Sequence, residues 1–217
     1  MVMEPLTRLT GPAAPMFQPN INTDAIAPMY SPATAGKPRG MTNTRADLAR
    51  MLFANWRYDQ NDSERPEFVL NRAPFRQARF LIAGPNFGCG SSRDSAPAML
   101  SAFGIRCVVA PSFGGIFNDN CFKAGVLPMI LAEDVVGVLA TTAEAGKDFD
   151  LDVAAQTLRA PDGSIVGFDI PAFRREQLLT GADEIALTLR RNNEITAYQQ
   201  RERALRPWNF LAGRPSG

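Results

Sequence analysis

From residue 78 to residue 146 the sequence alternates short apolar runs with longer segments of helical periodicity. Apolar runs of about four to eight residues bounded by turn residues are typical of buried strands, and Gly104 and Gly125 stand where helices would end. The pattern predicts strands at 78–84, 106–112 and 126–131 and helices at 95–103, 114–125 and 132–146. Because strand and helix alternate, successive strands should run parallel with right-handed crossovers, which indicates an α/β fold.

The pattern changes after Lys147 and predicts a mixed sheet. Residues 149–170 alternate apolar and polar side chains around a Pro-Asp-Gly turn at 161–163, which is typical of an antiparallel hairpin. The tail from residue 171 returns to helical periodicity. We therefore expect a parallel core to which an antiparallel hairpin is attached.

The first 75 residues are less regular. Residues 20–44 are rich in Pro, Gly, Asn and Thr and predict a long loop, and residues 44–56 predict a helix that begins near Thr44. Long loops inside a compact domain are often functional. A chain of 217 residues with 45% hydrophobic side chains can bury one full core, so we expect a single domain over residues 1–217.

Composition excludes several classes of function. The formal charge of +1 provides no basic field to attract nucleic acid or a membrane surface. No stretch approaches the ~18 apolar residues of a membrane span, and residues 1–10 lack the pattern of a signal peptide, so we expect a cytoplasmic protein. The chain contains no histidine, which excludes a Ser-His or Cys-His nucleophile pair and a histidine metal ligand within this chain.

The three cysteines, Cys89, Cys107 and Cys121, form no Cys-x-x-Cys pair and match neither a disulfide framework nor a zinc site. An iron–sulfur cluster normally takes about four thiolates, so we expect no metal and no cofactor to be held by this chain. Cys107, in the stretch RCVVA, and Cys121, in the stretch NDNCFKAG, are interpreted as core residues. Cys89 has no histidine to activate it and is interpreted as a small loop thiol.

Residues 86–95, NFGCGSSRDS, follow a predicted strand and precede a predicted helix. The glycines allow positive φ, and Pro97 belongs in a helix's first turn because it has no N–H to donate. Ser91, Ser92 and Arg93 would then stand at the helix N-terminus, where free N–H groups and a guanidinium suit a carboxylate or phosphate. The structural alternative is that Ser91 caps the helix, because Ser-x-x-Asp at 91–94 also fits a capping box. The loop lacks the Gly-Lys-Ser/Thr of a nucleotide-binding P-loop.

Several stretches in order resemble the family of 3-isopropylmalate dehydratase small subunits in the aconitase superfamily: NTDAIAP, FANWRY, NFGCGSSRD, VVAPSFGGIFNDNCFKAGVLPMIL, FDIPAFRR and LTGADEIALTLRRNNEITAYQ. The resemblance implies a swivelling β/β/α domain that docks on a separate large subunit with a [4Fe–4S] cluster, as a heterodimer or a higher assembly. The two chains would interconvert 2-isopropylmalate and 3-isopropylmalate by dehydration and rehydration in leucine biosynthesis.

The same resemblance implies roles for individual residues. Ser91 would be the catalytic base that takes the substrate proton, and Ser92 and Arg93 would hold a substrate carboxylate. Thr23 and Asp24, in the stretch NTDAI, would lie near the cleft. An electropositive pocket is what a serine base needs, because it lowers the pKa of the hydroxyl.

The chain departs from the family pattern at three places. Asp94 and Ser95 stand where the family has Glu-His, Asn22 replaces an Asp, and residues 27–40 differ from the usual loop. We expect residues 27–40 to select the substrate side chain. Two alternatives stay open: a related hydro-lyase subunit acting on a methylmalate, dimethylmalate or homocitrate type of substrate, and a non-catalytic carboxylate-binding protein.

Overall fold

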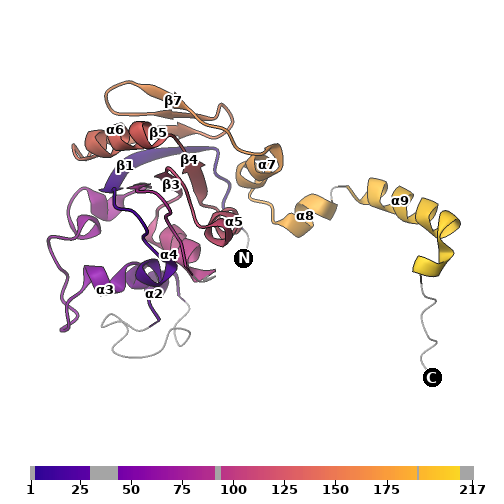
Figure 1. The fold of residues 1–217 in the computed structure, drawn as a ribbon, viewed down its shortest axis with the longest axis horizontal. Helices are drawn as coiled ribbons and strands as arrows, with labels where there is room; N and C mark the ends of the chain where they lie inside the picture. The colour runs from indigo at the N-terminus through magenta and orange to yellow at the C-terminus, as the bar shows by residue number, and fades with distance from the viewer. Residues whose placement is uncertain (1–2, 30–43, 91–93, 190, 211–217) are drawn as a thin grey trace. The chain divides into compact units, whose positions relative to one another are not determined.

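The computed structural model describes residues 3–29, 44–90, 94–189 and 191–210. The chain divides into two units, Met1–Gly181 and Ala182–Gly217, which are described separately. Within the described residues, the first unit contains a seven-stranded sheet in the order β4-β3-β2-β1-β5-β6-β7 (Figure 1). The strands are β1 Arg8–Met16, β2 Phe80–Ala83, β3 Cys107–Ala110, β4 Leu127–Ile130, β5 Asp148–Asp152, β6 Thr157–Arg159 and β7 Ile165–Gly167.

β1 joins a parallel half of the sheet to an antiparallel half. Ala13–Met16 pair in parallel with β2, which pairs in parallel with β3, and β3 pairs in parallel with β4. Arg8–Pro12 pair antiparallel with β5, and β5, β6 and β7 continue antiparallel. The expected α/β fold with a mixed sheet is confirmed. The predicted antiparallel hairpin around 161–163 is confirmed as β6 and β7, and β5 adds a second hairpin with a turn at 153–156.

Helices cover both faces of the parallel half (Figure 1). The helices of the first unit are α1 Thr23–Ile26, α2 Arg45–Met51, α3 Ala54–Arg57, α4 Ser95–Phe103, α5 Gly115–Lys123, α6 Glu133–Ala143 and α7 Ala172–Thr180, with 3₁₀ turns at Val69–Asn71 and Phe75–Gln77. The second unit contains α8 Glu184–Leu189, α9 Asn192–Leu205 and a 3₁₀ turn at Pro207–Asn209, so the helical periodicity of the tail is confirmed.

Two apolar cores lie on opposite faces of the sheet, as the alternation of side chains along a strand requires. Leu81 of β2 packs into the core beneath α4, with Met99 and Leu100. Its neighbours Phe80 and Ile82 pack into the other core, beside α6 and the antiparallel strands. The Phe80 and Phe149 ring centroids lie 6.1 Å apart, so this core ties the parallel half to β5.

Most predicted boundaries in the parallel half are close to those observed. α4 begins and ends at the predicted residues, and its C-cap Gly104 has a φ of 120°. α2 begins after Thr44, which forms a capping box with Asp47. The predicted helix over 44–56 is divided into α2 and α3, because Phe53 adopts a left-handed conformation with a φ of 50°. Among the described helices, none is both long and apolar enough to span a bilayer.

Candidate functional site

The segments that follow β1, β2 and β3 meet at the carboxyl edge of the parallel strands. They are residues 20–26, 84–90 and 111–115. Ligands of α/β proteins bind at this edge, because the loops that leave neighbouring strands converge there. The loop singled out by its sequence, which starts at Asn86, is the middle one of the three.

The segment after β1 holds one side of this middle loop through backbone hydrogen bonds. The Gly88 N–H donates to the Ile21 carbonyl at 2.7 Å, and the Thr23 N–H donates to the Cys89 carbonyl at 2.9 Å. Asn22 and Cys89 form an isolated parallel bridge. These bonds place Thr23 beside the start of the Gly-Ser-Ser-Arg stretch, although the two are far apart in sequence.

The segment after β3 holds the other side of the loop. The Phe87 N–H donates to the Ser112 carbonyl at 3.1 Å, and the Gly114 N–H donates to the Phe87 carbonyl at 2.9 Å. The Phe87 side chain is fully buried and meets the Phe117 ring edge-on, with centroids 5.4 Å apart. The loop is therefore fixed from both neighbours as far as Cys89.

Close packing requires glycine at residue 88. Its φ is +72°, which L side chains rarely adopt, and a Cβ added there would lie 2.2 Å from the Phe117 Cγ. Asn86 also has a positive φ, 59°, and its amide donates to the Asn20 Oδ1 at 2.8 Å. Asparagine tolerates this conformation better than most residues do.

Thr23 and Asp24 open the short helix α1 beside the loop. Asn22 is the N-cap, and its Oδ1 accepts from the Ala25 N–H at 2.8 Å. Thr23 is buried, whereas Asp24 is exposed. Asn22 thus serves as a helix cap where the resembling family has an aspartate, and a carboxylate oxygen could accept the same bond.

The helix that follows the loop begins at Ser95, with Asp94 as its N-cap and Pro97 in its first turn. The side chain of Asp94 makes no capping bond to this helix; its Oδ1 accepts instead from the Asn120 Nδ2 on α5 at 2.8 Å. First-turn amides of any helix have no carbonyl acceptor within the helix, so the N-terminus of α4 carries partial positive charge. The Oγ of Ser95 is buried and has no hydrogen-bond partner among the described residues.

Ser91, Ser92 and Arg93 lie outside the described residues. Their neighbours Gly90 and Asp94 are described and belong to the arrangement above. The capping-box alternative rests on the Ser91 side chain and stays a prediction; the described part of it, the Asp94 carboxylate, bonds to Asn120.

The structure places the three cysteines as their sequence contexts predict. Cys107 and Cys121 are fully buried, and burial raises the pKa of both thiols. Cys89 is half-buried in the middle loop. Over the described ranges, no group of three or more His, Cys, Asp or Glu side chains could hold a metal ion.

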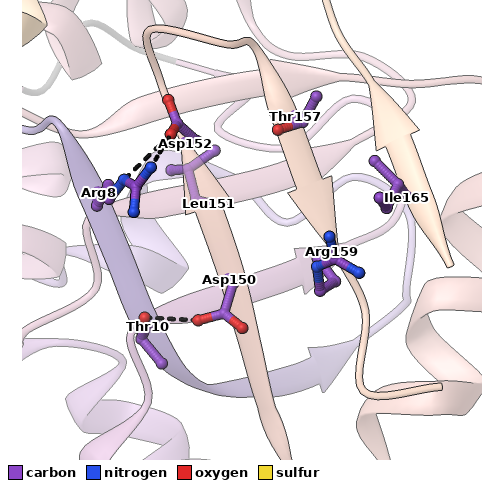
Figure 2. Close-up of a pocket in the computed structure, with 8 residues that line it drawn as sticks. All are labelled: Arg8, Thr10, Asp150, Leu151, Asp152, Thr157, Arg159 and Ile165. Carbon is purple, nitrogen blue, oxygen red and sulfur yellow. Dashed lines mark hydrogen bonds and ion pairs between the residues drawn. The ribbon is translucent and has the colours of Figure 1, made fainter. Parts of the chain in front are cut away.

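A hollow of about 350 Å³ lies away from this edge, on the antiparallel strands (Figure 2). Three of the charged side chains that line it are engaged across the strands, since Arg8 pairs with Asp152 at 2.9 Å and Asp150 accepts from the Thr10 hydroxyl at 2.6 Å. The Ala155 amide, together with Arg8, lowers the pKa of the Asp152 carboxyl. These are cross-strand contacts between β1 and β5, so we do not assign the catalytic site to this hollow.

Sequence reasoning missed the residues that support the loop from α5, Phe117 and Asn120. Both stand in the stretch IFNDNCFKAG, whose pattern predicts only a helix. Asn120 is only 7% exposed, and buried polar side chains have hydrogen-bond partners. The sequence does not reveal that the partner of Asn120 is Asp94.

Comparison with known proteins places these features in a family. A sequence model of the aconitase C-terminal domain matches residues 3–134, and a model of the C-terminal domain of the 3-isopropylmalate dehydratase small subunit matches residues 184–212. The 3-isopropylmalate dehydratase small subunit of Rhodospirillum centenum is 47% identical over 208 residues, covering 95% of this chain and 98% of that protein. The chain belongs to the family of 3-isopropylmalate dehydratase small subunits.

Other members of the small-subunit family agree. The small subunit of Parvibaculum lavamentivorans is 42% identical over 208 residues, covering 95% of this chain and all of that protein. A crystal structure of 3-isopropylmalate dehydratase from Methanocaldococcus jannaschii matches with a TM-score of 0.60 and 26% identity, covering 88% of this chain and 99% of that one. The resemblance found from the sequence motifs and the expected aconitase-type fold are confirmed.

Proposed function

We propose that this chain is the small subunit of a 3-isopropylmalate dehydratase and, with a large subunit, interconverts 2-isopropylmalate and 3-isopropylmalate. The reaction removes a proton and a hydroxyl group from adjacent carbons and returns water in the other orientation. One observation carries the proposal: the Thr23–Cys89 and Gly88–Ile21 hydrogen bonds bring the NTDAI and NFGCGSSRD stretches together at the carboxyl edge of the parallel strands. Membership of the small-subunit family supports the choice of substrate.

The residues of this chain would bind the substrate and move its proton. Ser91 is proposed as the base that takes the proton from carbon. Ser92 and Arg93 would hold a carboxylate, for which a guanidinium offers two parallel N–H donors. Thr23 and Asp24 would line the same cleft, because α1 is bonded to the loop at Cys89. The electropositive N-terminus of α4 would favour the ionised form of the serine.

The proposed [4Fe–4S] cluster belongs to the large subunit. The cysteines of this chain do not fit such a cluster, because Cys107 and Cys121 are buried with raised pKa values and a cluster binds thiolates. When bound in the partner, the cluster would supply Lewis-acid chemistry at the substrate hydroxyl. This chain would contribute the carboxylate site and the base.

We further propose that residues 1–217 act as one aconitase-type swivel domain in a heterodimer or a higher assembly. The near-neutral formal charge of +1 supports neither nucleic acid nor membrane as a partner, and amino-acid biosynthesis is consistent with a cytoplasmic location. A small dicarboxylate and the large subunit are the proposed partners.

Reconstitution tests the proposal. The full chain is mixed with the large subunit from the same genome, and interconversion of the isopropylmalates is measured beside each subunit alone. We expect activity only from the mixture and no stoichiometric iron in this chain. Preference for a methylmalate or homocitrate-type substrate would replace the proposed substrate with a related one, and carboxylate binding without turnover in the iron-loaded complex would leave a binding protein.

A further inference from the structure

We propose that Asn120 is a positioning residue that fixes the end of the Ser91–Arg93 stretch through Asp94. The inference rests on the function proposed above, since it assigns a role to a residue beside that site. Asn120 does not touch the expected substrate groups itself. It acts through a hydrogen bond from its Nδ2 to the Asp94 Oδ1, 2.8 Å long.

Asp94 is an N-cap residue whose side chain is used for something other than capping. An N-cap aspartate normally accepts a bond from the second or third amide of its helix. The backbone of Asp94 is instead helical, with φ −56° and ψ −24°, and its carboxylate makes no bond to α4. The carboxylate is bonded to a different helix, α5, so this bond ties the start of α4 to α5.

The environment of Asn120 fixes its side-chain amide in the orientation that binds the Asp94 carboxylate. It is only 7% exposed, its Nδ2 donates to Asp94, and its Oδ1 accepts from the Lys123 Nζ at 3.4 Å. Because the lysine can only donate and an ionised carboxylate can only accept, Oδ1 must face Lys123 and Nδ2 must face Asp94. Buried amides that are satisfied in this way have one preferred orientation.

α5 therefore supports the loop on both sides of the proposed catalytic stretch. Before that stretch, the Phe117 ring packs against Gly88, and Gly114 bonds to Phe87. After it, Asn120 bonds to Asp94. α5 is itself tied to α7 by the ion pair between Asp119 and Arg174, at 3.3 Å. α5 thus holds the described residues on either side of the proposed catalytic stretch, which is the support that a pre-organised site needs.

The test exchanges the two polar partners in the full chain, assembled with its large subunit. Asn120→Asp places two carboxylates in contact and breaks the bond. The double variant Asp94→Asn with Asn120→Asp restores an amide–carboxylate pair with the direction of donation reversed. Asn118→Asp is the matched control, because it makes the same change on α5 at a half-buried side chain without a hydrogen bond to any described residue.

We expect Asn120→Asp to lower kcat/KM by about 10- to 100-fold, with kcat falling as well as KM rising, because a small misplacement of a reacting group is costly. The double variant should regain most of this loss. Asn118→Asp should stay within about twofold of the wild type, as substitutions away from packed or hydrogen-bonded groups usually do. The melting temperature and the recovery of the complex are measured for each variant.

A second readout does not depend on turnover. Hydrogen exchange at the amides of residues 88–96 in the full chain should become faster in Asn120→Asp, return toward wild type in the double variant and stay unchanged in Asn118→Asp. A lower melting temperature with normal kcat/KM, or a loss that the double variant does not recover, would overturn the positioning role. Failure of the wild type to convert isopropylmalate would contradict the proposed function, while the exchange rates would still decide the role of Asn120.

Discussion

Replacing Gly88 by alanine tests whether the loop is held against α5 as described. The new Cβ would lie 2.2 Å from the Phe117 Cγ, at a residue whose φ is +72°. The left-handed conformation costs an alanine about 1–2 kcal/mol, and forcing a methyl group into a packed site costs about 1–3 kcal/mol more. We expect Gly88→Ala to lower the free energy of unfolding by about 2–5 kcal/mol.

Gly163 is a matched control for this substitution. Its φ is +88°, and no heavy atom lies within 4 Å of the Cβ position. Gly163→Ala should therefore show the backbone cost alone, about 1–2 kcal/mol. Urea unfolding followed by circular dichroism measures the free energy of unfolding of both variants. The dependence of this free energy on urea concentration should be the same in both, which excludes changes in the denatured state. If Gly88→Ala and Gly163→Ala lost the same free energy of unfolding, the packing of Phe117 against Gly88 would be refuted. Activity of the reconstituted enzyme should fall further in Gly88→Ala than in Gly163→Ala.

Three further predictions concern the base, a carboxylate and substrate choice. Ser91→Ala should reduce kcat of the reconstituted enzyme by about 10²–10⁴-fold with an unchanged melting temperature, whereas near-normal activity with a lower melting temperature would indicate a structural serine. The Ala155 amide and Arg8 lower the pKa of Asp152, so this carboxylate stabilises the fold above its unfolded pKa and ceases to do so as the pH falls through its folded pKa. Asp152→Asn should have a lower urea midpoint than the wild type at neutral pH, and the gap should close below about pH 4; a gap independent of pH would contradict the assignment. Exchanging residues 27–40 for the loop of a relative should change the kcat/KM ratio of isopropylmalate to methylmalate, and an unchanged ratio would place selectivity elsewhere.

The parallel half of the fold could be predicted because the residues that begin and end its helices and strands act locally. Pro97 and Gly104 mark the two ends of α4, and the apolar runs at 78–84 and 106–112 contain buried strands. Each of these signals acts within about one turn of helix or one strand, so no distant contact is needed to interpret it.

β1 could not be predicted, although it is central to the sheet. Its sequence, RLTGPAAPM, contains two prolines, which lack the N–H of a ladder bond and argue against a central strand. The pairing explains why they are tolerated: Arg8–Pro12 pair with β5, whereas Ala13–Met16 pair with β2. Each part of the strand is paired on one side, so an N–H on the other side is not needed. This division depends on the tertiary fold.

The candidate site likewise has a part that local sequence predicts and a part that depends on contacts between distant segments. The glycines and the strand before them predict a sharp loop at 86–90, and the positive φ values of Gly88 and Gly90 confirm it. The bond between Thr23 and Cys89, and the bond between Asn120 and Asp94, join segments that are far apart in the sequence. Such contacts follow from strand order and helix packing, which periodicity alone does not provide.

The contacts around the loop also bear on which catalytic groups the small subunit and the large subunit would each contribute. The described residues on either side of the proposed catalytic stretch are tied to neighbouring segments, since Cys89 bonds to Thr23 and Asp94 bonds to Asn120. In the proposed heteromeric enzyme, the large subunit would bring the metal and the substrate hydroxyl to the carboxylate site proposed for this chain. On this reasoning, changes at Asn120 or Gly88 should impair turnover in the assembled enzyme without altering the partner's iron content.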